Sequence, residues 1–429
     1  MYSNLFSSTI VQPKLQNRYE GKNLTPHLVS FRELVPEITS TSYLTHPIYY
    51  YPAKFIPHVV KYCIDNYTRE NDWIIDPFAG SGTVGLESNL AKRNAVLLDL
   101  NYLLNHIIPI KIPKDKTTLD IFVLNKKLKQ IFNNDSQFTP NWSNIDYWYP
   151  PEMLELLKKY WAGQKKLDND LYSMIIQSTL VKVSKQFSYA EHKTPKLFKS
   201  KHKKEFIDNL LKKDWKSELI NAMTTISNNT IKSINQYTNI TKNNNNEILY
   251  FGGVDSASYK IEKNLQIDCL ITSPPYLQAQ EYIRTFKLDL YWLGYTEIQI
   301  KEISKLEIPY RKTKELIETE TLNKIREKLQ IKNLIELLNS YFYFTIVSLE
   351  NAMTNLKRGG LACIFIGNPK VDGLEVETWR IFNEYFAEKG FLFRAIYEDQ
   401  IKTRQLFKTR NNKNPDGMKS EFLLIIEKL

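Results

Sequence analysis

The stretch Ile74–Thr83, with the sequence Ile-Ile-Asp-Pro-Phe-Ala-Gly-Ser-Gly-Thr, decides the fold of this chain. It begins with the end of a short apolar run typical of a buried parallel strand, and Pro77 stops that strand because it has no amide hydrogen to donate. Gly80 and Gly82 allow a left-handed backbone, or the close approach of a ligand. The stretch therefore predicts a strand, a tight loop and a helix that starts near Val84.

A second strand is predicted about twenty residues further along the chain, at the spacing of a nucleotide-binding unit. It covers 95–98 and ends at Asp99, an acid that can hold the hydroxyls of a ribose. No lysine follows Gly82 as it would in a P-loop, and the Asp-Pro-Phe start differs from the dinucleotide fingerprint. Acids at two strand ends without a phosphate binder favour an adenosine ligand that lacks phosphates, such as S-adenosylmethionine.

A second motif, Thr-Ser-Pro-Pro-Tyr at 272–276, follows the apolar run 267–271. An exposed polyproline ligand is the alternative interpretation, and it is disfavoured because the motif directly follows a buried-type strand. Taken together, Asp-Pro-Phe-Ala-Gly-Ser-Gly-Thr and Thr-Ser-Pro-Pro-Tyr resemble the DNA amino-methyltransferases, which methylate N4 of cytosine or N6 of adenine. The resemblance covers roughly 49–103 and 248–429.

This resemblance implies an α/β fold: a Rossmann-like methyltransferase sheet with helices on both faces, a large helical insertion, and S-adenosylmethionine as the cofactor. Lys54 and Phe55 match the family segment that closes over the methionine end of the cofactor, and Asp255 matches the acid that receives the adenine amino group. No metal is expected. The expected cofactor-binding residues are Lys54, Phe55, Asp76, Phe78, Gly80, Ser81, Gly82, Thr83, Asp99, Asn101 and Asp255.

The catalytic residues expected from the second motif are Ser273, Pro274, Pro275 and Tyr276. An exocyclic amine is a poor nucleophile because its lone pair is delocalised into the ring, so nearby acceptors must draw it towards tetrahedral geometry. The Ser273 hydroxyl and the Pro274 carbonyl are suitable acceptors. The ring of Tyr276 can stack on an extracted base for about 1–3 kcal/mol, comparable to the few kcal/mol that unstacking costs.

The sequence indicates the identity of the methylated base less directly than it indicates the reaction. Ser273 stands where most adenine enzymes of the resembled family carry Asp or Asn, and Ser resembles the N4-cytosine group. No Pro-Cys pair supplies a nucleophile for methylation at C5. We therefore expect N4-methylcytosine in double-stranded DNA as the product, with N6-methyladenine as the alternative and an RNA methyltransferase as a less favoured one.

Composition and charge agree with a nucleic-acid partner. The chain has 429 residues, a formal net charge of +11 and a pI near 9.1, which favours a polyanion. Three widely separated cysteines without metal-ligand spacing are typical of a reducing compartment, and no membrane span is expected, so we expect a cytoplasmic protein. The resemblance to the DNA amino-methyltransferases implies a prokaryotic protein that is associated with the nucleoid when it acts. Since no nuclease motif is present, any restriction endonuclease would be a separately encoded partner.

Three regions are expected: 1–103 as an N-terminal arm and cofactor half, 104–246 as a helical insertion that recognises the target sequence, and 247–429 as the catalytic half. Apolar residues at helical spacing predict helices at 150–162, 171–187 and 204–233. The most basic stretch is 193–204, which is either a DNA contact or a solvated face. The expected DNA contacts are Lys193, Lys196, Lys199, Lys201, Lys203, Lys204 and Arg284.

Overall fold

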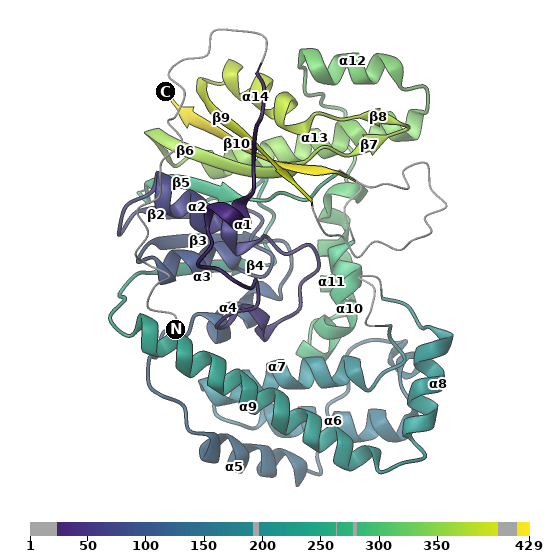
Figure 1. Ribbon diagram of the computed structural model, residues 1–429. Helices are drawn as coiled ribbons and strands as arrows, with labels where there is room; N and C mark the ends of the chain where they lie inside the picture. The colour runs from purple at the N-terminus through teal and green to yellow at the C-terminus, as the bar shows by residue number, and fades with distance from the viewer. Residues whose placement is uncertain (1–23, 192–196, 263, 278–280, 402–417) are drawn as a thin grey trace.

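The computed structural model describes residues 24–191, 197–262, 264–277, 281–401 and 418–429 (Figure 1). Its central element is an eight-stranded sheet with the order β1-β9-β10-β6-β5-β2-β3-β4. β10 is antiparallel to both of its neighbours, and the other pairs are parallel. The strands are β1 (His27–Val29), β2 (Trp73–Asp76), β3 (Asn94–Asp99), β4 (Ile248–Gly252), β5 (Ile267–Thr272), β6 (Leu356–Gly367), β9 (Phe391–Gln400) and β10 (Ser420–Lys428).

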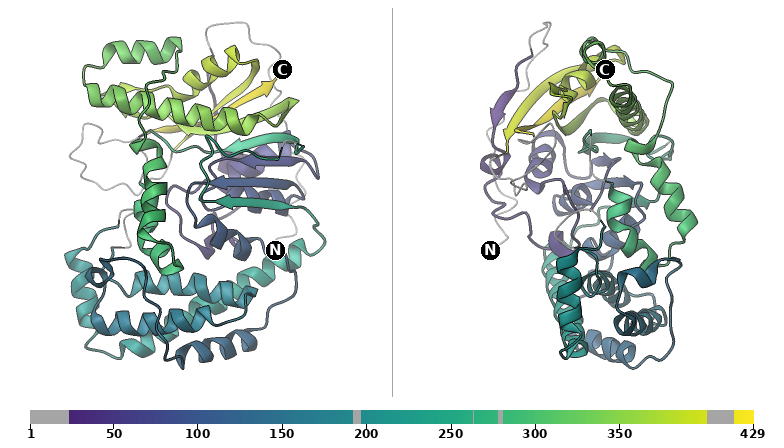
Figure 2. Two further views of the ribbon diagram at one scale, coloured as in Figure 1. Left: turned by 180° about the vertical axis from the view of Figure 1, so that it is seen from behind. Right: turned by 90° about the vertical axis from the view of Figure 1, so that its right-hand side faces the viewer.

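Helices cover both faces of this sheet, because its strands carry apolar residues on both sides (Figure 2). Ile74 packs on one face and Ile75 on the other, as the alternation along a strand requires. The first face is covered by α1 (Phe31–Leu34), α2 (Pro57–Tyr67), α3 (Thr83–Leu90) and α4 (Leu104–Lys111). The second is covered by α12 (Glu320–Lys328), α13 (Lys332–Met353) and α14 (Thr378–Glu388). The expected Rossmann-like α/β architecture is confirmed.

The order of the strands reverses beside β2. From β2 the chain proceeds outwards to β3 and β4, and it then returns to form β5 on the other side of β2. The carboxyl ends of β2 and β5 are joined there, since the Thr272 hydroxyl donates a hydrogen bond to Asp76 Oδ1 at 2.6 Å. Open parallel sheets bind their ligands at such a reversal point.

A separate region of helices lies between β3 and β4 in the sequence (Figure 1). Beyond α4 it contains α5 (Ile121–Phe132), η3 (Ile145–Trp148), α6 (Pro151–Lys165), α7 (Leu171–Gln186), α8 (Lys201–Leu210) and α9 (Trp215–Thr241). The helices predicted at 150–162 and 171–187 are confirmed as α6 and α7. The single helix predicted at 204–233 is wrong, because the Asp214 side chain accepts the Ser217 amide and starts a new helix there.

Two helices from the later part of the chain complete the core of this helical region. They are α10 (Tyr282–Leu293) and α11 (Glu297–Leu306), which run between the sheet and the helical region in Figure 1. Trp292 of α10 stacks on Trp161 of α6 with ring centroids 5.6 Å apart, and its indole N–H donates to the Tyr149 hydroxyl at 2.7 Å. Packing therefore crosses the boundary expected at residue 247.

The remaining short elements are η2 (His46–Ile48), η4 (Ile308–Tyr310) and the hairpin of β7 (Lys370–Val371) with β8 (Leu374–Glu375). Across the described part of the chain, no helix combines the length and the apolar character needed to cross a bilayer.

Candidate active site

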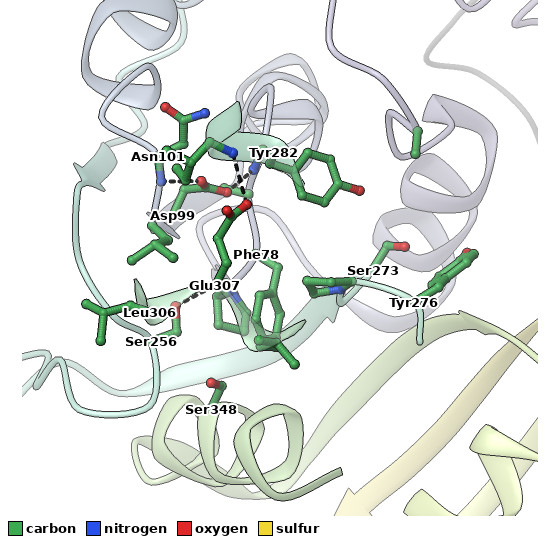
Figure 3. A pocket seen from close by; sticks show the side chains of 18 of the residues that line it. Phe78, Asp99, Asn101, Ser256, Ser273, Tyr276, Tyr282, Leu306, Glu307 and Ser348 are labelled. Carbon is green, nitrogen blue, oxygen red and sulfur yellow. Dashed lines mark hydrogen bonds between the residues drawn. The ribbon is translucent and has the colours of Figure 1, made fainter. Parts of the chain in front are cut away.

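A single pocket at the reversal point is lined by residues from both sequence motifs (Figure 3). The glycine loop and the end of β3 contribute one side, and the 273–276 loop contributes another. Of the residues expected from the sequence, the pocket is lined by Lys54, Phe55, Phe78, Gly80, Ser81, Asp99, Asn101, Asp255, Ser273, Pro275 and Tyr276. The fold thus brings the two motifs together, although nearly two hundred residues separate them in the sequence.

The glycine loop has the conformation that its sequence predicts. Gly80 and Gly82 have φ angles of 53° and 73°, in the left-handed region. A Cβ on Gly80 would lie 3.2 Å from Tyr51 Cε1, and one on Gly82 would lie 2.1 Å from Ile108 Cδ1. Gly82 and the buried Thr83 do not line the pocket, so their contribution is to turn the chain into α3.

Asp99, at the tip of β3, accepts a backbone hydrogen bond on each carboxylate oxygen. Gly80 N lies 2.7 Å from Oδ2, and Asn101 N lies 2.7 Å from Oδ1. Burial raises the pKa of Asp99 to about 6, and the two amide hydrogen bonds oppose that shift. A carboxylate has about four lone-pair sites, so Asp99 can still accept hydrogen bonds from a ligand in the pocket.

Asp76 lies beneath the two loops and does not line the pocket. Its Oδ1 accepts hydrogen bonds from the Thr272 hydroxyl and from Phe78 N at 3.0 Å. Burial raises its pKa to about 7. Its position makes it a link between the glycine loop and the 273–276 loop rather than a direct ligand contact.

Lys54 and Phe55 form the wall next to the glycine loop. The Lys54 ammonium lies 3.0 Å from His46 Nδ1, and the other ring nitrogen of His46 lies 2.6 Å from Glu87 Oε1. Burial lowers the pKa of Lys54 to about 8 and raises the pKa of Glu87 to about 7. Phe55 stacks on Phe365 of β6 with ring centroids 5.6 Å apart. Lys54 is therefore held by a buried polar chain that the sequence did not reveal.

The 273–276 loop leaves the end of β5. Ser273 and Pro275 face the pocket, and Pro274 is buried beneath them. The Tyr276 hydroxyl donates a hydrogen bond to Glu421 Oε1 at 2.9 Å. Burial, followed by the charge of Glu421, raises the pKa of Tyr276 well above its ordinary value, so this phenol stays protonated.

Asp255 is engaged by an arginine from a distant segment. Arg311 Nη1 lies 3.0 Å from both carboxylate oxygens of Asp255, and its guanidinium lies 3.8 Å from the centre of the Phe344 ring. Both members of this ion pair line the pocket. Any ligand group that meets Asp255 therefore also meets Arg311.

The pocket is also lined by residues that sequence reasoning missed, among them Tyr51, Tyr282 and Glu307. Tyr51 and Tyr282 stack with ring centroids 5.7 Å apart. Glu307 accepts a hydrogen bond from Ile283 N at 2.9 Å, and burial raises its pKa to about 7. Figure 3 shows its carboxylate and that of Asp99 at the same end of the pocket. Tyr51 lies in an aromatic and proline-rich cluster that could have been a signal, whereas no local pattern marks Glu307.

The lysines of the basic stretch that follows α7 lie in different surroundings. Lys193 and Lys196 lie outside the described residues. Lys203 is 3% exposed and its ammonium donates to Gln186 O at 2.7 Å, so the expected phosphate contact is not available to it. The Lys199 ammonium lies 4.5 Å and 4.2 Å from the ring centres of Tyr147 and Tyr189.

The other expected DNA contacts are exposed. Lys201 has a side-chain exposure of 92%, and Lys204 pairs with Asp208 at 2.6 Å on the surface of α8. Arg284, at the start of α10, pairs with Glu281 at 2.9 Å and is 54% exposed. These exposed side chains can reach a polyanion, and α8 lies in the helical region, apart from the central sheet (Figure 1).

Comparison with known proteins finds a matching family model and several similar proteins. A model of a DNA methylase family, covering N6 and N4 amino-methyltransferases, matches residues 2–108. Type II methyltransferase M.BsoBI of Geobacillus stearothermophilus is 26% identical over 336 residues, which cover 71% of this chain and 63% of that protein. Type II methyltransferase M.MjaII of Methanocaldococcus jannaschii is 29% identical over 187 residues, covering 41% of this chain and 32% of that protein.

A third relative, type II methyltransferase M.AvaI of Nostoc sp., is 22% identical over 424 residues, covering 89% of this chain and 86% of that protein. The chain thus spans 63% and 32% of the first two relatives and most of the third.

Proposed function

Because the chain belongs to the DNA amino-methyltransferase family, we propose that it transfers a methyl group from S-adenosylmethionine to the exocyclic N4 of cytosine in double-stranded DNA. The observation that carries this proposal is the shared pocket, in which the Asp99 end of β3 and the Ser273–Tyr276 loop lie together. One ligand in that pocket can contact both, so a methyl donor and an acceptor amine can meet there.

Members of this family use S-adenosylmethionine as the methyl donor. The pocket residues fit that molecule, because Asp99 and Glu307 offer acceptors for the two ribose hydroxyls and Gly80 presents backbone without a side chain. In our proposal Phe55 and Lys54 lie at the methionine end, while Asp255 with Arg311 lies at the adenine end. Gly82, Thr83 and Asp76 support this site from behind.

In this reaction the protein contributes mainly by positioning the methyl donor and the target amine. The bound cofactor supplies a sulfonium methyl group for in-line transfer. Ser273 Oγ and the Pro274 carbonyl would accept the N–H groups of the target amine and draw its lone pair out of the ring, and Tyr276 would stack on the extracted base. The three cysteines are free and buried, which leaves them unsuited to act as nucleophiles.

The choice of cytosine rests on Ser273, a neutral acceptor at a position where Asp or Asn is typical of adenine enzymes. N6-methyladenine is the second candidate product, since the pocket would serve either amine. We further propose that the helical region holds the duplex, with Lys199, Lys201, Lys204 and Arg284 near phosphates. The similarity to type II methyltransferases supports a role in restriction and modification, with any endonuclease on a separate chain.

Mass spectrometry of nucleosides tests this proposal. DNA incubated with the protein and S-adenosylmethionine should contain N4-methylcytosine, and Tyr276→Ala should abolish its formation while leaving S-adenosylhomocysteine binding intact. N6-methyladenine would overturn the choice of base and leave the reaction class standing. The absence of both products from DNA of varied sequence would overturn the function.

A further inference from the structure

The aromatic ring of Tyr276 lies on a strand that is remote from it in the sequence. A Cβ added to Gly367, the last residue of β6, would lie 3.2 Å from Tyr276 Cε2. The edge of the ring therefore lies close to Gly367, and the Met418 side chain lies closer still, with Sδ 2.3 Å from the added Cβ. The surface that carries the ring is the carboxyl end of β6, beside the 273–276 loop at the end of β5.

The hydroxyl of the same tyrosine is fixed by the neighbouring strand. Glu421 of β10 lies opposite Gly367 in the antiparallel β6–β10 pair, and its Oε1 accepts the Tyr276 hydroxyl at 2.9 Å. A hydrogen bond to an ionised carboxylate is stronger and more directional than one between neutral groups. Two adjacent strands thus both contact the Tyr276 side chain, β6 beside the ring and β10 at the hydroxyl.

We propose that Glu421 is a positioning residue for methyl transfer: through the Tyr276 hydroxyl it holds the ring that stacks on the target base in place beside Gly367. This inference rests on the proposed function, because it assigns Glu421 a part in the same reaction.

A merely structural role for Glu421 is the competing explanation, in which the side chain only fastens the loop to the sheet. Both explanations act through the Tyr276 hydroxyl, and they differ in the quantity that the loss of this hydrogen bond changes. A positioning role acts through that hydroxyl and affects turnover, while loop fastening alone would change the melting temperature and cofactor binding.

The test is a double-mutant cycle on the full chain with a cognate duplex and radiolabelled S-adenosylmethionine. Glu421→Ala and Tyr276→Phe should each lower kcat by about tenfold or more, with the KM for S-adenosylmethionine within about twofold. Glu421→Gln should stay within about threefold of the parent, because its amide oxygen accepts the same hydrogen bond. The double variant Tyr276→Phe with Glu421→Ala should be no slower than Tyr276→Phe alone.

Independent effects of the two substitutions would overturn the inference, as would a Gln variant as slow as the Ala variant. Glu421→Met, of similar size but without an acceptor, replaces Glu421→Ala in the cycle should the latter fail to melt cooperatively. A parent protein that transfers no methyl group to DNA would overturn the proposed function, and the inference with it. An active parent with additive variants would overturn the inference alone.

Discussion

Four acids in and around the pocket have pKa values raised mainly by burial: about 7 for Asp76, Glu87 and Glu307, and about 6 for Asp99. Each accepts hydrogen bonds that favour its ionised form, and burial outweighs them. Such acids destabilise the folded protein when they are charged and no ligand compensates them. They are therefore suited to a ligand that brings hydroxyl donors and positive charge.

The first prediction concerns Asp99. Asp99→Ala should weaken S-adenosylhomocysteine binding by about 1.5–3 kcal/mol, the range for hydrogen bonds to a charged group. Affinity of the parent should fall as the pH drops through about 6, because protonation removes the charged acceptor. Isothermal titration calorimetry at several pH values measures both effects. Equal affinity in a folded Asp99→Ala variant would contradict the ribose assignment.

A second prediction follows from Glu307. Glu307→Gln keeps an oxygen for Ile283 N and removes a buried charge, so it should raise stability at pH 8 by about 1–2 kcal/mol. The same change should weaken S-adenosylhomocysteine binding, since the ribose would lose a charged acceptor near Asp99. Urea denaturation and calorimetry on the same sample test the two together. Glu302→Gln, on the exposed side of α11, is the matched control.

At the scale of elements, α8 and the loop before it carry three lysines that we propose to lie near phosphates: Lys201 and Lys204 are exposed, and Lys199 is half-buried. Neutralising Lys199, Lys201 and Lys204 together should weaken DNA binding and reduce the slope of log affinity against log salt by about 0.9 for each phosphate that no longer meets a lysine. Cofactor affinity should stay the same. Fluorescence anisotropy over a salt series measures the slope.

Lys203→Gln serves as the control for this third prediction. It changes the charge in the same helix, but its ammonium is buried against Gln186 O and should release no counterions. A parent-like slope in the triple variant would locate the phosphate-binding surface elsewhere on the protein.

The elements also show what the sequence could predict. Strands with uniform apolar runs, the glycine loop and the Pro-Pro turn are encoded locally, and the structure contains them where they were expected. The break between α8 and α9, just before Trp215, was missed in the sequence. A helix-capping aspartate that lies between two segments with helical apolar spacing cannot be told from an ordinary surface residue of one long helix. Tyr276 and Glu421 are 145 residues apart, and no local pattern can reveal that they meet.

The candidate site was predictable to the same extent. Asp99, Ser273 and Tyr276 follow directly from strand ends and motifs, and all three line the pocket. Glu307 and Arg311 come from a segment that forms a wall only after the chain has folded, so their sequence neighbours carry no sign of it. The roles of all five residues in binding or catalysis remain predictions that the experiments above address.

For the whole molecule, the buried charges predict an unusual dependence of stability on pH. The acids have folded pKa values above their unfolded ones, so the folded state binds more protons and the free energy of unfolding falls as the pH rises from about 4 to 7. Lys54 and Lys182 have folded pKa values of about 8, below the unfolded value, so stability rises again above pH 8.

Urea midpoints at pH 5.5, 7.5 and 9 should therefore be lowest at pH 7.5. The buffer set is matched in ionic strength, because salt would otherwise shift the contribution of surface charges. A midpoint that is highest at pH 7.5 would contradict this fourth prediction.

The stacking of Trp292 on Trp161 has an evolutionary consequence. If target preference resides in the helical region, two relatives could not exchange it by recombining 104–246 alone, because α10 supplies part of that region's core. A hybrid gene would need both 104–246 and α10 from the same parent, and α10 begins at the candidate pocket. New target preferences would thus arise more readily by gradual substitution on the exposed faces of α8 and its neighbours than by shuffling of whole segments.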